Sequence, residues 1–140
     1  MLFAIGGDDG DGTGARIGKM VELYSADRDT WILAPPMPTY RCGMGVATLD
    51  GLVYVAGGWN GAPLKTVEIY DASNSSWTTG KPINQSRQDA SAVAVDGKVL
   101  LAGGCSKPTR NLTAAASRMI SDSLLALAVS ANDPGAMVEQ

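Results

Sequence analysis

The feature that most restricts the fold of this chain is an internal repeat with a period of 46 residues. A shift of the sequence by this period places residues 21–58 over residues 67–104, and 13 of the 38 aligned positions are then identical. Two unrelated segments of this length would share about two or three residues by chance. The chain is therefore expected to fold as successive copies of one small structural unit.

Each unit is expected to contain four short β-strands. Apolar runs at residues 45–49 and 52–56 are separated by an Asp-Gly dipeptide, which is typical of a tight hairpin turn, and the same arrangement recurs one unit later. A third strand is expected at residues 67–70 and a fourth from Trp77. Four strands in about 46 residues are typical of one blade of a propeller.

Glycine pairs, aromatic residues and a carboxylate mark the same places in successive units. Twin glycines suit a strand end where the backbone turns sharply or passes close to a neighbour, and the aromatics supply apolar area to bury. A buried carboxylate needs donors, so a backbone or arginine partner is expected for it rather than catalysis. The predicted structural residues are Gly6, Gly7, Gly57, Gly58, Gly103, Gly104, Tyr24, Tyr70, Trp31, Trp77, Glu22 and Glu68.

These residues resemble a kelch motif. The stretch from Arg41 to Gly58, followed by Val67-Glu68-Ile69-Tyr70 and Trp77, is similar to that motif, and the likeness extends over residues 2–104. The resemblance implies an all-β fold of kelch-type β-propeller blades around a channel, serving as a protein-binding platform. Residues 1–104 would supply about two to two and a half blades, whereas closed propellers have about four to eight. An incomplete ring is expected: a fragment, an assembly of copies, or an open stack with exposed edges.

Residues 105–140 are expected to form a divergent tail. The tyrosine and tryptophan of the repeat do not recur there, and apolar residues fall near helical spacing in an alanine-rich stretch. A helix is predicted over residues 113–130. Two interpretations stay open: the helix covers the exposed edge of the last hairpin, or the tail is unrelated and results from truncation of a longer gene product.

Composition excludes several classes of function. The chain has no histidine, which removes a Ser-His-Asp triad and metal sites that use imidazole. A formal charge of −3 without a basic cluster argues against a nucleic-acid partner. No apolar run reaches membrane-spanning length and no export signal is seen, so a cytoplasmic protein without a membrane partner is expected. No metal or cofactor is expected, because the acidic loop at residues 8–14 does not follow EF-hand spacing.

Candidate binding residues lie in loops that the blades would present at one end. Arg41 and Arg87 are 46 residues apart, each before the first strand of a unit, and the kelch resemblance implies that such arginines help to line a binding pocket. A guanidinium suits a carboxylate-bearing peptide, and the open alternative is that each arginine packs against or pairs with a neighbouring blade. The remaining candidates are Trp59, Asn60, Tyr40, Gln85 and Ser86.

The predicted function is a non-enzymatic protein-protein interaction module of the kelch type, used in substrate recognition or scaffolding. The expected partner is another protein, with an acidic peptide segment as one candidate and self-association through open blade edges as another. A ubiquitin-ligase adaptor role rests on family analogy alone, because no BTB or F-box-like segment is present. The alternatives are a fragment of a kelch-propeller enzyme, either galactose-oxidase-like or a sugar-acid isomerase, and a truncated non-functional gene product.

Overall fold

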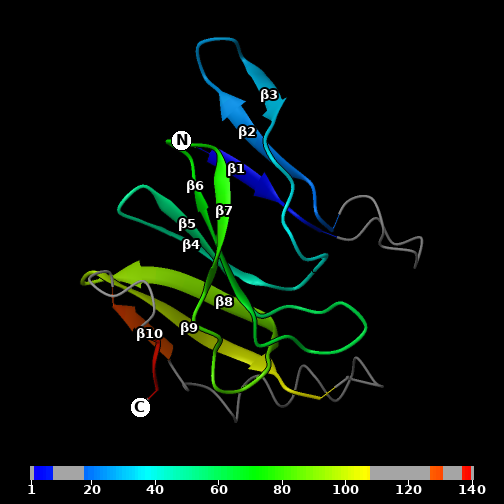
Figure 1. The fold of residues 1–140 in the computed structure, drawn as a ribbon, viewed down its shortest axis with the longest axis vertical. Coiled ribbons are helices and arrows are strands. Elements are labelled where there is room, and N and C mark those ends of the chain that lie inside the picture. The colour runs from blue at the N-terminus through cyan, green and yellow to red at the C-terminus, as the bar shows by residue number, and fades with distance from the viewer. Residues whose placement is uncertain (1, 8–17, 108–126, 131–136, 140) are drawn as a thin grey trace.

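The structure is a computed structural model that describes residues 2–7, 18–107, 127–130 and 137–139. These residues form three antiparallel sheets and no helix, which confirms the all-β fold (Figure 1). No helix able to cross a membrane is therefore found in this part of the chain. The first sheet contains β1 (Leu2–Ile5), β2 (Val21–Ser25) and β3 (Thr30–Leu33); the second contains β4 (Gly45–Leu49), β5 (Leu52–Ala56), β6 (Val67–Asp71) and β7 (Ser76–Gly80); the third contains β8 (Gln88–Val95), β9 (Lys98–Cys105), β10 (Leu127–Ser130) and β11 (Met137–Glu139).

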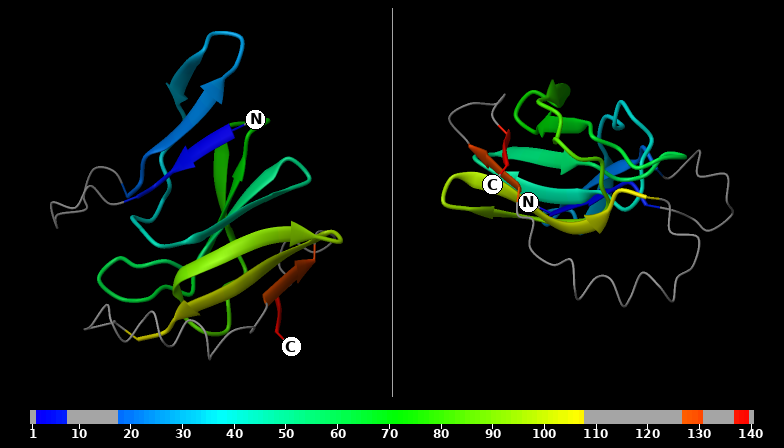
Figure 2. Two further views of the ribbon diagram at one scale, coloured as in Figure 1. Left: turned by 180° about the vertical axis from the view of Figure 1, so that it is seen from behind. Right: turned by 90° about the horizontal axis from the view of Figure 1, so that it is seen from below.

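Each sheet is a meander in which strands that follow one another in the sequence lie side by side. The first sheet has three strands, and the second and third have four each. The three sheets succeed one another along the molecule, with the first and the third at opposite ends (Figure 2). The described strands do not close into a ring, and this open succession of sheets is consistent with the partial propeller blades that the sequence predicts.

The Asp-Gly turns form as the sequence predicts. Asp50 and Gly51 have φ angles of 50° and 80°, and Asp96 and Gly97 have 49° and 70°. Positive φ at both central residues matches the twist of the flanking strands, so the two-residue turn fixes the register of each hairpin. In the second sheet this register pairs Leu49 with Leu52 and carries through to the end of the strands.

Alternation along the strands gives each sheet two faces, which we call front and rear. The front face is turned toward the preceding sheet and the rear face toward the following one. On the second sheet the front face carries Val53, Val55 and Tyr70, and the rear face carries Tyr54 and Ile69. All five are at most 5% exposed. Full burial of such side chains contributes about 1.5–3 kcal/mol each, so packing between sheets is the main source of stability.

The tail adds two strands to the third sheet, and the predicted helix over residues 113–130 is wrong for its last four residues. Residues 113–126 lie outside the described part of the chain, whereas residues 127–130 form β10, which pairs with β9. The outer edge of β9 presents unpaired backbone donors and acceptors, and pairing satisfies them. This pairing with a distant strand outweighs the local helix preference of leucine and alanine.

Candidate functional site

Arg41 is the centre of a buried polar cluster at the entry to β4. Its Nη1 donates to the carbonyl oxygens of Gly57 (2.8 Å) and Thr66 (3.0 Å), and its Nη2 donates to Thr66 Oγ1 (2.9 Å). Nη2 also lies 3.1 Å from Oε1 of Glu68, forming an ion pair. Burial lowers the pKa of Arg41, and the Glu68 carboxylate offsets part of that shift. The cluster fastens the start of β4 to the end of β5 and the start of β6.

The guanidinium of Arg41 does not reach the surface, because the residue is 0% exposed. The two interpretations open at the sequence level were a partner-binding role and a structural role, and these contacts are of the second kind. Arg41 Nε and Glu68 Oε2 are also buried, without a hydrogen-bond partner among the described residues. Removing either charge would therefore leave the other buried with still fewer partners.

Arg87 repeats part of this arrangement in the third sheet. Its Nη1 donates to the carbonyl oxygen of Gly103 (2.9 Å), as Arg41 does to Gly57, and its Nη2 donates to Gln85 Oε1 (3.2 Å). The residues 46 positions after Thr66 and Glu68 are Leu112 and Ala114, which carry neither a hydroxyl nor a carboxylate. Arg87 is 9% exposed, so a little of it is accessible.

The glycine pair at the end of β5 lets two loops touch. Gly57 and Gly58 have φ angles of 66° and 98°, which L-residues with side chains rarely adopt. A Cβ on Gly57 would lie 2.5 Å from the carbonyl oxygen of Arg87, and one on Gly58 would lie 2.8 Å from that of Cys42. The Gly58 amide donates to the Arg87 carbonyl (2.7 Å), so this contact joins the second sheet to the connection that enters the third.

The loop between β5 and β6 presents Trp59 and Asn60. The Trp59 backbone pairs with that of Cys42 in both directions, with N–O distances of 2.8 and 3.1 Å, so the start of the loop is held rigidly. Residues 60–62 at its tip are exposed, and Trp59 itself is partly exposed. This loop is therefore accessible to a partner.

The other candidates border the same end of the sheets. The ring of Tyr40 lies against Gly18, where a Cβ would come within 2.0 Å of it. Gln85 is exposed and its Nε2 donates to Ser106 Oγ (3.4 Å), while Ser86 is partly buried. The structure thus brings the loop residues to one end of the molecule and turns Arg41 inward.

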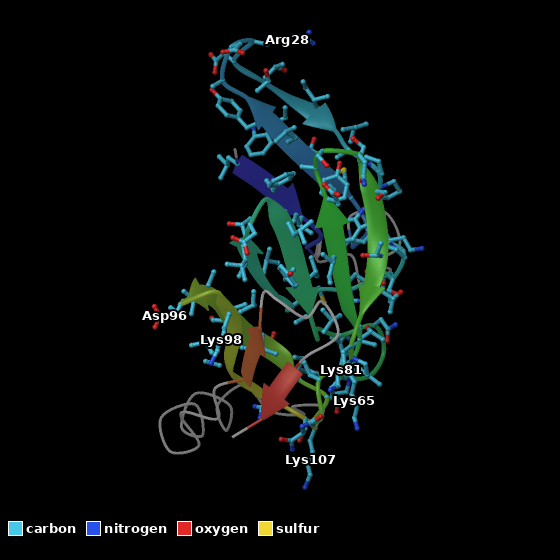
Figure 3. The ribbon with its side chains drawn as sticks, turned by 60° about the vertical axis from the view of Figure 1, so that its left-hand side comes forward. Arg28, Lys65, Lys81, Asp96, Lys98 and Lys107 are labelled. Atoms are coloured by element: carbon cyan, nitrogen blue, oxygen red, sulfur yellow. The ribbon has the colours of Figure 1, made fainter. Side chains whose placement is uncertain are left out.

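Three exposed lysines at this end were missed by the sequence reasoning. Lys65 precedes β6, Lys81 follows β7 and Lys107 follows β9. Figure 3 shows their side chains gathered at one end of the molecule, away from Asp96. The signal that could have found Lys65 and Lys81 is topological: β6 and β7 are antiparallel, so the residue before β6 and the residue after β7 must be neighbours.

Within the described residues, no three His, Cys, Asp or Glu side chains converge as metal ligands would. The acidic loop considered from the sequence, residues 8–14, lies outside that part of the chain.

The segment that contains Arg41 and the loop between β5 and β6 is similar to known proteins. Residues 40–84 match a sequence profile of the kelch motif. Kelch-like protein 8 of Mus musculus is 36% identical over 61 residues, which cover 44% of this chain and 9% of that protein. Kelch repeat and BTB domain-containing protein 2 of Ectromelia virus (strain Moscow) is 34% identical over 58 residues, covering 41% of this chain and 10% of that protein. The chain thus spans about a tenth of the length of each of these relatives.

Proposed function

Because residues 40–84 are a kelch motif, we propose that this chain is a non-enzymatic protein-interaction module that binds an acidic segment of another protein at the loop end of its sheets. The kelch repeat is typically an interaction module. By the loop end we mean the loop between β5 and β6 together with Lys65, Lys81 and Lys107. The observation that carries the proposal is a partly exposed tryptophan in a loop that backbone hydrogen bonds hold in place, at the end of the sheets where the three exposed lysines gather (Figure 3).

The fastening of the loop favours binding. The Arg41 cluster holds both ends of the loop, and the paired backbones of Trp59 and Cys42 hold its first residue. A loop that is already ordered loses little conformational entropy when a partner docks. Tryptophan is enriched among the residues that dominate binding energy, because it combines a large apolar area with an N–H donor.

The charge at this end indicates the chemistry of the partner. The chain carries a net charge of −3, yet three of its lysines are exposed together here. Exposed cations at the rim of an interface raise the rate of encounter with an acidic partner and contribute modestly to affinity. The binding should therefore weaken as salt is raised, since these charges face solvent.

A peptide selection tests this proposal. We expect a random peptide library displayed on phage to yield peptides rich in Asp and Glu when it is selected on the immobilised chain. A fluorescent copy of a selected peptide should bind about tenfold more weakly to Trp59→Ala and to the triple variant Lys65→Glu/Lys81→Glu/Lys107→Glu.

Lys98→Glu is the matched control, because Lys98 is also exposed but lies away from the loop end, beside Asp96 (Figure 3). It makes the same Lys→Glu substitution at one position, a change of −2 in net charge against −6 for the triple variant, and it should leave the affinity within about twofold. The proposal would be contradicted if the selected peptides lacked acidic residues. It would also be contradicted if the triple variant and Lys98→Glu lost the same affinity for the peptide.

A further inference from the structure

The exposed large apolar side chains of the described residues are not scattered. They lie in or beside the first sheet and on the hairpin of the third sheet, and the second sheet contributes none of them. Single exposed apolar residues are ordinary on a protein surface, but groups of them mark surfaces that pack against something. The residues, with their exposed fractions, are Leu2 57%, Met20 36%, Trp31 45%, Ile32 38%, Leu33 72%, Val93 51% and Val95 44%.

The front face of the first sheet carries residues equivalent to those on the front face of the second sheet, but in the described structure no sheet packs on it. In the second sheet, Val53 is 1% exposed and pairs with Tyr70, which packs edge-on against Phe3 with ring centroids 6.0 Å apart. The indole N–H of Trp77 donates to the carbonyl oxygen of Pro35 (2.8 Å). The first sheet therefore supplies the cover for the second.

In the first sheet the equivalent residues are present, but no other described part of the chain covers them. Leu2 pairs with Tyr24 as Val53 pairs with Tyr70, yet Leu2 is 57% exposed. Trp31 is 45% exposed, and its indole has no acceptor among the described residues.

The rear face of the third sheet is the matching half. Val93 lies 46 positions after Ala47, which is 8% exposed and packs in the core between the second and third sheets. Val93 itself is 51% exposed and pairs with Leu100, the counterpart of Tyr54. The third sheet thus presents outward the face that, in the second sheet, is covered by its neighbour.

We propose that the front face of the first sheet of one copy packs on the rear face of the third sheet of a second copy, and that two copies close head to tail. The chain already makes this front-to-rear packing twice, between its first and second and between its second and third sheets. The proposed contact would repeat between copies the packing that the equivalent residues make within the chain. It leaves the loop end free, so it does not depend on the proposed function.

The number of sheets agrees with closure. Two copies, each with the three sheets that its described residues form, bring six sheets together, which lies within the range of about four to eight blades in closed propellers. A front-to-rear contact is heterologous, and such contacts give a ring when the rotation closes and a filament when it does not. Closure at two copies would cover both apolar faces of both chains.

Light scattering after size-exclusion chromatography tests the proposal. We expect the particle formed by the chain at about 100 µM to have twice the single-chain mass of 14.5 kDa. Leu2→Lys on the front face and Val93→Lys on the rear face should each raise the dissociation constant of the dimer at least about tenfold, because each places a charge in an apolar contact. Both residues are exposed in the single chain, so its fold should tolerate the change, and circular dichroism checks this.

Thr79→Lys is the matched control. Thr79 is exposed on the second sheet, which takes no part in the proposed contact between copies, so a lysine there adds the same charge outside that contact. The variant should dimerise like the unchanged chain.

A monomer at about 100 µM overturns the proposal, and the two faces then belong to sheets of another polypeptide. A dimer that only Leu2→Lys weakens is front-to-front, and a mass that grows beyond that of the dimer as concentration rises is an open filament; either result also overturns it.

Discussion

The first and second sheets carry the same motif residues in different surroundings. The aromatic pair forms in both, with ring centroids 5.4 Å apart for Tyr24 and Trp31 and 5.1 Å apart for Tyr70 and Trp77. Glu68 is 4% exposed and ion-paired, whereas its counterpart Glu22 is only partly buried and has no ion pair among the described residues. The motif residues therefore determine the contacts inside a sheet, whereas the neighbouring sheet and loops determine how deeply those residues are buried and whether the carboxylate is ion-paired.

The largest difference between the two sheets should appear when the carboxylate is neutralised. Glu68→Gln leaves the buried guanidinium of Arg41 without its counter-charge, and we expect it to lower the free energy of unfolding by about 3–5 kcal/mol. Glu22→Gln should change it by less than about 0.5 kcal/mol. Urea denaturation at low protein concentration, where the chain is a monomer, measures both. If both variants lost the same free energy of unfolding, the ion pair between Arg41 and Glu68 would stabilise the fold no more than the partly buried carboxylate of Glu22 does.

A smaller difference is expected between the glycine pairs. Gly57→Ala puts a Cβ 2.5 Å from a backbone carbonyl at positive φ, which should cost about 3 kcal/mol. Gly6 also has positive φ, but its Cβ would meet the flexible Met44 Cε at 2.7 Å and would lie 3.0 Å from the nearest backbone carbonyl, that of Arg41. Gly6→Ala should therefore cost only about 1–2 kcal/mol. Thermal denaturation of the two variants side by side ranks them, and the reverse order would contradict the backbone contact at Gly57.

The smallest difference should come from the indole donors. Trp77→Phe removes the hydrogen bond to the Pro35 carbonyl and leaves most of the apolar contact, so about 1 kcal/mol should be lost. Trp31→Phe removes an N–H that has no acceptor in the described chain and should cost less than about 0.5 kcal/mol in the monomer. The same urea titration measures both variants, and a larger cost at Trp31 would show that its indole is engaged.

Much of the fold could be predicted from the sequence because it is encoded locally. The Asp-Gly turns, the glycine pairs and the alternation of apolar residues each act within a few neighbouring positions. The strand at residues 127–130 could not be predicted in this way. Its partner β9 already ends at Cys105, far from it in the sequence, and an unpaired edge changes which conformation is favoured.

The candidate site was predictable only in part, for a similar reason. Trp59 and Asn60 follow a glycine pair in a turn, and their exposure agrees with that position. Arg41 has the same turn-like surroundings in the sequence, but Thr66 and Glu68 converge on it from the far side of the β4–β5 hairpin. The sequence predicted a backbone or arginine partner for Glu68, but the spacing of residues did not identify Arg41 as that partner, and the three exposed lysines are likewise neighbours only in the folded chain.

The hydrogen bonds of Arg41 hold the ends of the loop between β5 and β6 without depending on the amino-acid sequence of that loop. The two carbonyl contacts of Arg41, at Gly57 and Thr66, lie at the two ends of that loop, and neither uses a side chain from residues 59–64. The corresponding stretch in the first unit, residues 8–20, is longer than residues 59–66. The repeat therefore already accommodates two loop lengths, and residues 59–64 form a cassette in which randomised sequences of different lengths could be displayed for directed evolution.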